Sequence, residues 1–144
     1  MTSPAIGDLI VPRTATVRES LVVIDRTAQG LAFVADDAGR LVGVITDGDI
    51  RRALLAGAGL EATVDRVMRP DFVALPVSAA PEEIIRALDE RIRIVPLLDA
   101  AGRPVDYASV RRQHRIPVME PSLSGNELAY VVECIRTNWV SSQG

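Results

Sequence analysis

The sequence is poor in aromatic residues, in net charge and in long apolar runs, and each shortage excludes a class of protein. Aromatic side chains make up 3% of the 144 residues, which argues against the base-stacking surfaces of proteins that bind single-stranded nucleic acid. The net charge of −3 provides no broad attraction to nucleic acid or to an anionic membrane. No apolar run approaches the length of a membrane span. We therefore expect neither nucleic acid nor a membrane among the partners.

Cysteine and histidine each occur once. The lone Cys134 cannot form an internal disulfide, and no basic segment followed by an apolar one opens the chain. We therefore expect a cytoplasmic location. His114 has no partner that the sequence identifies, so no catalytic dyad is predicted. An apolar fraction of 48% is typical of a globular protein with a sizeable core.

The first part of the chain has the pattern strand, helix, strand, strand, helix. Residues 8–11 (DLIV) form a short, mostly apolar opening segment, and apolar spacing predicts an amphipathic helix over 17–25. Thr16 followed by Glu19 predicts a capping box at the start of that helix. Residues 31–35 and 41–45 are predicted strands, joined by turn residues at 36–39. The next helix is expected to open at Asp49 and to end near Gly57.

The junction between the 41–45 strand and the helix after it is the clearest candidate site. A strand that passes directly into a helix leaves N–H groups unpaired and exposes the positive end of the helix dipole, which suits an anion. Thr46 can offer a hydroxyl to a phosphate, and Asp49 can accept hydrogen bonds from a ribose diol. This spacing suits a phosphorylated nucleoside. The alternative is that Thr46 or Asp47 only caps the helix.

The same pattern recurs 63 residues later, where residues 99–103 fall on residues 36–40 and Ser109 falls on Thr46. The second copy contains a predicted helix over 81–91. Its apolar face is expected to comprise Ile84, Ile85, Leu88 and Ile92. Two copies at a fixed offset imply two halves packed about a pseudo-twofold axis, with a cleft between them that suits a small ligand.

Residues 16–113 resemble a tandem pair of CBS domains. The residues that carry the resemblance are TVRESL at 16–21, GVITDGDIRR at 43–52, and the second copy from Val67 onward. In CBS pairs that bind adenine nucleotides, a Thr or Ser at the strand end holds phosphate and an Asp three residues later holds the ribose. The resemblance therefore implies a phosphate role for Thr46 and a ribose role for Asp49. The backbone at the position of Thr16 often meets the adenine, so Thr16 is a further candidate.

The second copy departs from this pattern. Ser109 keeps the hydroxyl and is a candidate binding residue, but Arg112 stands where the first copy has Asp49. A guanidinium cannot accept ribose hydroxyls. Arg112 could instead reach a polyphosphate or be a solvated helix residue. We expect at most one well-formed nucleotide site, built by the first junction with help from the second copy.

Other charged residues near the junction allow two interpretations each. Arg51 and Arg52 could approach phosphates or be ordinary exposed helix arginines. Asp47 and Asp49 alone provide too few ligands to bind a metal ion. No metal site and no catalytic residue is therefore predicted.

The residues after Gln113 belong to neither copy. SGNE at 124–127 predicts a capping box, and apolar spacing over 128–135 predicts an amphipathic helix. This tail resembles the opening of the DegT/DnrJ/EryC1 family of pyridoxal-phosphate-dependent sugar aminotransferases, through IPV at 116–118, EPSLSGNE at 120–127 and NWVSSQG at 138–144. The resemblance implies pyridoxal phosphate (PLP) only in a domain beyond Gly144. No lysine here can supply the Schiff base, so the chain itself is not expected to be an enzyme.

The expected fold class is α+β, with two β-α-β-β-α CBS repeats related by a pseudo-twofold axis and a C-terminal amphipathic helix. The expected boundaries are 1–60 for the first repeat, 61–115 for the second and 116–144 for the start of an aminotransferase domain. The expected function is regulatory binding of an adenine nucleotide (AMP, ADP or ATP) at the front of a nucleotide-sugar aminotransferase that makes surface polysaccharide, in a homodimer formed through helical faces. The alternative is a pair that acts only as a homodimerisation scaffold for the appended enzyme.

Overall fold

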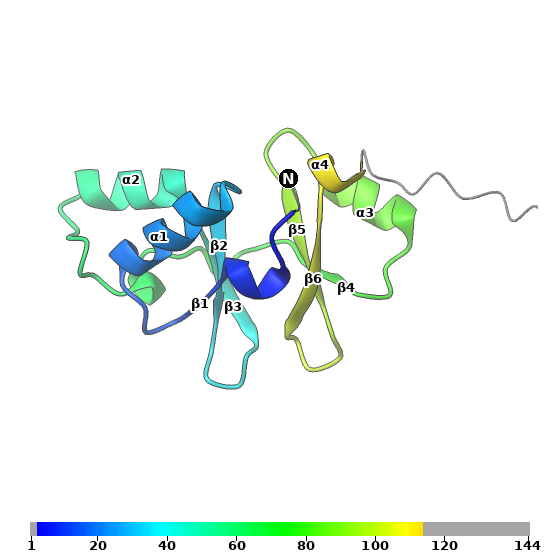
Figure 1. Ribbon diagram of the computed structural model, residues 1–144, viewed down its shortest axis with the longest axis horizontal. Helices are drawn as coiled ribbons and strands as arrows, with labels where there is room; N and C mark the ends of the chain where they lie inside the picture. Colours follow the sequence, from blue (N-terminus) through cyan, green and yellow to red (C-terminus); the bar gives the residue numbers. More distant parts are fainter. Residues whose placement is uncertain (1–2, 114–144) are drawn as a thin grey trace, which may run out of the picture. The chain divides into compact units, whose positions relative to one another are not determined.

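The computed structural model describes residues 3–113, which fold as two successive units of three strands with helices (Figure 1). The first unit contains a 3-10 turn η1 (Ile6–Leu9), β1 (Ile10–Pro12), α1 (Val17–Thr27), β2 (Leu31–Ala35), β3 (Leu41–Thr46) and α2 (Asp47–Leu55). The second contains η2 (Val64–Arg66), β4 (Leu75–Pro76), α3 (Pro81–Ala87), β5 (Ile94–Leu98), β6 (Pro104–Ser109) and α4 (Val110–Gln113). The predictions for Cys134, His114 and the tail helix lie outside the described residues. Within these residues no helix is both long and apolar enough to cross a membrane.

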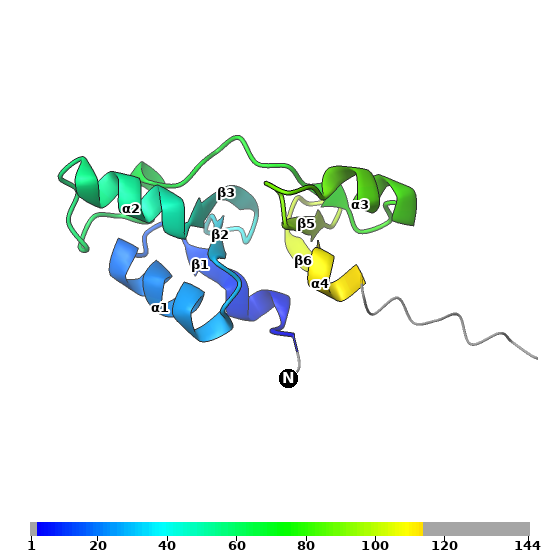
Figure 2. The same cartoon turned by 90° about the horizontal axis from the view of Figure 1, so that it is seen from above.

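Each unit has its own three-stranded mixed sheet. In the first, β1 pairs parallel to β2 and β2 pairs antiparallel to β3; in the second, β4, β5 and β6 repeat this arrangement. Figure 2 shows α1 and α2 together on one side of the first sheet, and α3 and α4 together beside the second. The predicted α+β fold with two similar halves is confirmed.

The two hairpins match in detail at the predicted offset. The β2–β3 register shifts between Val34 and Ala35, and the β5–β6 register shifts at the corresponding residues 97 and 98. Gly39 and Gly102 both have φ of +80°, a turn conformation that costs a glycine little. In both hairpins an Asp carboxylate accepts a 2.9 Å bond from the Nε of the Arg four residues later. The same local sequence thus produces the same turn twice.

Two predicted helix boundaries are wrong. Helix α2 begins at Asp47 directly after β3, because Thr46 acts as the N-cap; the predicted start at Asp49 is two residues too late. Helix α3 ends at Ala87 rather than at residue 91. Its end has a local cause, since the Asp89 carboxylate accepts bonds from the N–H groups of residues 91 and 92, and such turns compete with helix. Ile85, predicted on the apolar face, is 56% exposed.

The apolar interior consists of two clusters. One lies between α1, α2 and the first sheet and also contains Val64 of η2, which packs against the first unit. The other joins the units, because Phe33 and Leu41 of the first pack in one cluster with Ile94 and Tyr107 of the second. The Tyr107 hydroxyl also donates to the Pro4 carbonyl at 2.9 Å. The contact between the copies is therefore a shared core rather than a polar surface contact.

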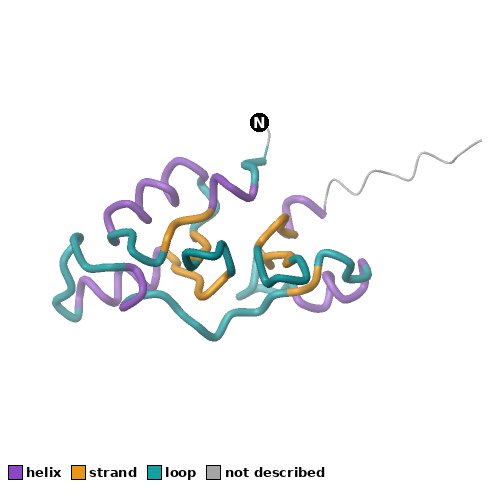
Figure 3. Tube along the Cα trace, turned by 90° about the horizontal axis from the view of Figure 1, so that it is seen from below, coloured by secondary structure: helices purple, strands orange, loops and turns teal. Residues whose placement is uncertain are grey.

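The segment that links the units is fixed to the first sheet near Gly43. Figure 3 shows this segment as a loop that leaves α2 and runs to the second sheet. Val44 N donates to Arg69 O at 3.0 Å, and Arg69 N donates to Val44 O at 2.8 Å. A Cβ on Gly43 would lie 2.8 Å from Met68 Cγ and 3.2 Å from Arg69 O. Glycine at 43 therefore lets the linker lie close enough to β3 to form these two bonds.

Candidate functional site

A cleft of about 430 Å³ opens beside the end of β3 and is lined by both units. This volume lies within the range of about 300–1,000 Å³ that small-molecule sites occupy. The first unit contributes side chains from β2 and β3, including Thr46, and the linker contributes residues between Arg69 and Val73. The second unit contributes the α3–β5 loop and the start of β5, from Asp89 to Pro96. The predicted combination of the first junction with the second copy is therefore present around one cavity.

The cleft combines aromatic and cationic side chains. Both phenylalanines of the chain, Phe33 and Phe72, line it; Phe33 is fully buried and Phe72 half-buried. Three arginines, at positions 69, 91 and 93, and two carboxylates, Asp71 and Asp89, also line it, so the cations exceed the anions by one. An apolar wall with a few convergent cations suits a ligand that has a flat ring at one end and negative charge at the other.

Thr46 and Asp49 form a complete capping box at the start of α2. Thr46 Oγ1 accepts a bond from Asp49 N at 3.2 Å, and Asp49 Oδ2 accepts from Thr46 N at 3.0 Å and from Thr46 Oγ1 at 2.8 Å. The capping interpretation is thus satisfied in this structure. Thr46 lines the cleft, whereas Asp49 does not and is only 7% exposed.

The Asp49 carboxylate is also held by arginine. Its Oδ1 accepts a short hydrogen bond from Arg52 Nη2, and Arg69 Nε lies 4.0 Å from the same oxygen. Both arginine side chains are more than half exposed. The acid predicted to hold ribose is therefore surrounded by donors and would have to exchange one of them for a ligand.

The other two candidate binding residues, Thr16 and Ser109, do not line this cleft. Thr16 caps α1, where its Oγ1 accepts from Glu19 N at 3.2 Å and Glu19 Oε2 accepts from Thr16 N at 2.7 Å; it does not line the cleft. Ser109 is 4% exposed and lines a second, smaller cavity of about 190 Å³. This cavity contains residues 28–30 of the first unit and residues 93–94 and 109–111 of the second, so it occupies the position related to the first cleft by the repeat.

Sequence reasoning missed Phe72 and Arg93. Arg93 lines both cavities, and at the 63-residue offset it corresponds to Gly30. Comparison of the α3–β5 loop with the α1–β2 loop could have identified this cation, because it stands immediately before a predicted strand. Phe72 falls on Leu9 at the same offset, so the repeat predicts an apolar residue at this position but not its place beside the cleft.

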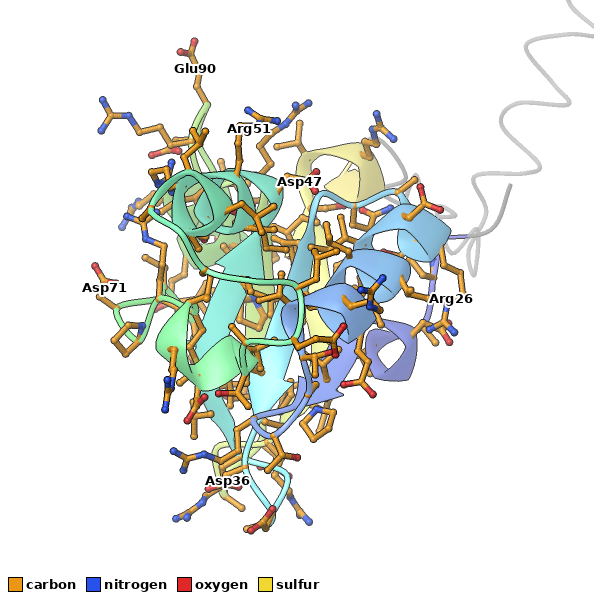
Figure 4. All side chains as sticks on the ribbon, turned by 90° about the vertical axis from the view of Figure 1, so that its left-hand side faces the viewer. Arg26, Asp36, Asp47, Arg51, Asp71 and Glu90 are labelled. Carbon is orange, nitrogen blue, oxygen red and sulfur yellow. The ribbon has the colours of Figure 1, made fainter. Side chains whose placement is uncertain are left out.

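Three carboxyl groups have a pKa below the usual value for aspartate. Backbone N–H groups of Ile92 and Arg91 hold the pKa of Asp89, at the edge of the cleft, below its usual value. The backbone N–H of Arg40 lowers the pKa of Asp36, and that of Arg103 lowers the pKa of Asp99. Figure 4 shows Asp36 at the end of the molecule opposite Asp47 and Arg51. The hairpin acids therefore stabilise turns and take no part in the cleft.

Within residues 3–113 no group of three or more His, Cys, Asp or Glu side chains could hold a metal ion.

The cleft lies in a region that matches a known family. The model of the CBS domain matches residues 1–56 and again residues 64–112. The chain belongs to the CBS domain family. The two matched segments correspond to the two structural units, so the chain contains a CBS pair.

Curated relatives and solved structures are similar to this pair. The arabinose 5-phosphate isomerase KdsD of Pseudomonas aeruginosa is 31% identical over 102 residues, which cover 69% of this chain. The chain spans 31% of the length of that isomerase. The cytosolic domain of the Mg²⁺ channel MgtE, solved in complex with ATP, is 27% identical with a TM-score of 0.62 over 74% of this chain and 43% of its own. Hypoxic Response Protein I, at 22% identity, has a TM-score of 0.66 over 78% of this chain and 97% of its own, and supports the fold.

Proposed function

We propose that this CBS pair binds one adenine nucleotide per chain in the cleft beside Thr46. The observation that carries the proposal is the lining of that cleft, which combines a strand-end hydroxyl, the half-buried Phe72 and three arginines. The MgtE domain, which was solved with ATP, has the same fold, and the family resemblance supplies the roles. Thr46 would hold phosphate and Asp49 would hold ribose.

The electrostatics of the cleft support a ligand with phosphate. Asp47 and Asp49 stand in the first turn of α2 and offset the positive end of the helix dipole, so the helix start alone is a weak anion site. Arginines 69, 91 and 93 can balance phosphate charge instead. Neither Arg91 nor Arg93 forms an ion pair within residues 3–113. Thr16 and Ser109 are weaker candidates, because neither lines this cleft.

The nucleotide would act as a regulatory signal for an appended domain. The tail resembles the start of a sugar aminotransferase, and the curated relatives carry a comparable pair within sugar-phosphate isomerases. We therefore propose a regulatory pair attached to a PLP-dependent enzyme of nucleotide-sugar metabolism. A ligand between the two units favours one arrangement of them, and the enzyme responds only if its contacts differ between arrangements.

A second candidate function is a homodimerisation scaffold that binds no nucleotide. It is favoured by exposed apolar side chains on helices α1 and α2, where Val22 is 59% exposed, Leu54 40% and Leu55 83%. The completed capping box also agrees with it, because Thr46 and Asp49 already have partners in the protein. The two functions differ in one observable property, since the first requires nucleotide binding and the second excludes it.

The test is calorimetric titration of the chain with AMP, ADP and ATP, with and without magnesium. We expect saturation near one nucleotide per chain, with at least a tenfold loss of affinity in Asp49→Ala (about 1.4 kcal/mol). The matched control is Asp47→Ala, which removes a carboxylate from the same helical turn but leaves the capping box intact. Circular dichroism checks that both variants fold. If the wild-type chain binds none of the three nucleotides, the scaffold is the better account.

A further inference from the structure

The partners of Asp49 raise the question of how a ligand gains access to its carboxylate. Oδ2 accepts two bonds from Thr46, and Oδ1 accepts one from Arg52. The Thr46 bonds also cap α2, so a ligand that broke them would destabilise the helix start. The bond from Arg52 lies outside the capping box. Arg52 is therefore the partner that a ribose can replace at the lowest cost.

The Arg52 side chain lies back over the first turn of α2. Its Nη1 is 3.4 Å from the position that a Cβ on Gly48 would occupy, so the guanidinium lies against the backbone of this turn. A cation is unfavourable beside a helix N-terminus because of the helix dipole. The pair with Asp49 is what compensates for this position. The side chain is 68% exposed, so the guanidinium is free to leave.

The same guanidinium lies near the Thr46 hydroxyl, since both are within 4 Å of the Cβ position on Gly48, although Arg52 does not itself line the cleft. The first turn of α2 is next to Thr46, the residue at the mouth of the cleft with the hydroxyl proposed to hold phosphate. A ligand with both a ribose and a phosphate can take the Asp49 oxygen and give the displaced guanidinium a new anionic partner. A ligand with ribose alone breaks the Asp49–Arg52 pair without replacing it.

We propose that Arg52 makes this site select nucleotides over nucleosides. Arg52 acts as a specificity-determining residue: it competes with a nucleoside for Asp49 and pairs with the phosphate of a nucleotide. This inference rests on the proposed function, since it assumes that Asp49 holds ribose. Arg69 replaces Arg52 only in part, because its Nε is 4.0 Å from Oδ1 and its backbone is fixed by two bonds to Val44.

The experiment compares AMP with adenosine as ligands of the whole chain. Titrations of the wild type give a reference ratio of the two affinities. In Arg52→Ala we expect adenosine to bind about fivefold more tightly, the value of one exposed ion pair. AMP should bind more weakly, so that the ratio falls at least tenfold. Arg52→Lys retains a cation and should restore part of the ratio.

The matched control is Arg51→Ala. Arg51 precedes Arg52 on the same helix, is exposed and forms no ion pair within residues 3–113; Figure 4 marks it on α2. Its substitution should leave the ratio unchanged. An equal weakening of both ligands in Arg52→Ala would indicate a merely structural role and overturn the inference.

The outcomes also separate this inference from the proposed function. If AMP binds the wild type and is lost in Asp49→Ala, but Arg52→Ala keeps the wild-type ratio, the role of Arg52 is wrong and the nucleotide site stands. If neither the wild type nor Arg52→Ala binds AMP or adenosine, both proposals fail. Adenosine binding that appears only in Arg52→Ala would support the inference directly.

Discussion

Gly43→Ala tests the contact that fixes the linker beside the cleft. The added Cβ would lie 2.8 Å from Met68 Cγ and 3.2 Å from Arg69 O, where carbon contacts are optimal at about 3.5–4.0 Å. The methionine can turn aside because its side chain is flexible. The carbonyl cannot move without breaking the two backbone bonds between Arg69 and Val44. The substitution therefore forces strain or breaks those bonds.

Strain and the loss of the two hydrogen bonds predict a similar decrease in the free energy of unfolding. Two backbone hydrogen bonds are worth about 1–3 kcal/mol together, and overpacking of a filled site costs about the same. We expect Gly43→Ala to lower the free energy of unfolding by about 2 kcal/mol in urea titrations. Gly7→Ala is the matched control, because a Cβ at Gly7 meets nothing within 4 Å; its effect should stay within about 0.5 kcal/mol.

Hydrogen exchange identifies which bonds are lost. The amides of Val44 and Arg69 should exchange faster in Gly43→Ala, and the hairpin amide of Gly39 should keep its wild-type rate. Nucleotide affinity should fall as well, because Arg69 and Phe72 form the linker wall of the cleft. If the stability of Gly43→Ala is within about 0.5 kcal/mol of the wild type, with unchanged exchange at both amides, the linker adapts freely and the reasoning is refuted.

Three further predictions concern the cap, the hairpins and the shared core. Thr46→Ala should cost about 1 kcal/mol of stability and Thr46→Ser only a few tenths, because Ser keeps the capping oxygen; equal losses in thermal unfolding would contradict the cap. Hairpin N–H groups lower the pKa of Asp36 and Asp99 in the folded state, so their stabilisation is present above the unfolded pKa and is lost as pH falls through the folded pKa. Asp36→Asn with Asp99→Asn should flatten the decline of stability below about pH 4, and an unchanged decline would assign it to other carboxylates. Phe33→Ala should cost about 3–5 kcal/mol, since Phe33 is fully buried in the cluster that joins the units; a cost under about 1 kcal/mol would show that the units do not depend on this cluster.

The sequence predicted those features that depend on local chemistry. The capping box at Thr16 and the turn at residues 36–39 were predicted from residues within four positions of one another, and capping by Thr46 was one of two alternatives; the structure contains all three features. The end of α3 was missed because the Asp89 turn competes with an apolar pattern that continues past Leu88. Helix periodicity does not detect such competition.

The site was predictable only in part, for a different reason. Thr46 lines the cleft because a strand end and a helix start must meet there, which local sequence determines. Phe72 reaches the cleft through the path of the linker, which depends on Gly43 and its contact with Met68. That path is a tertiary property. The partners of Asp49 were predictable in part: its capping bonds follow from spacing, whereas the bond from Arg52 depends on which side-chain conformation the arginine adopts.

Two differences between the repeats bear directly on the proposed site. The hairpin turns are equivalent in sequence, register and turn geometry, because both copies need the same turn to form a sheet. Around the clefts the copies diverge: Gly30 corresponds to Arg93, and Asp49 corresponds to Arg112. Fold maintenance alone does not require divergence at these positions. Divergence is expected if the first copy binds the ribose of a ligand and the second copy contributes a cation to the wall of the same cleft. Arg93 lines both cavities, so it is the residue through which the second copy would complete the site of the first.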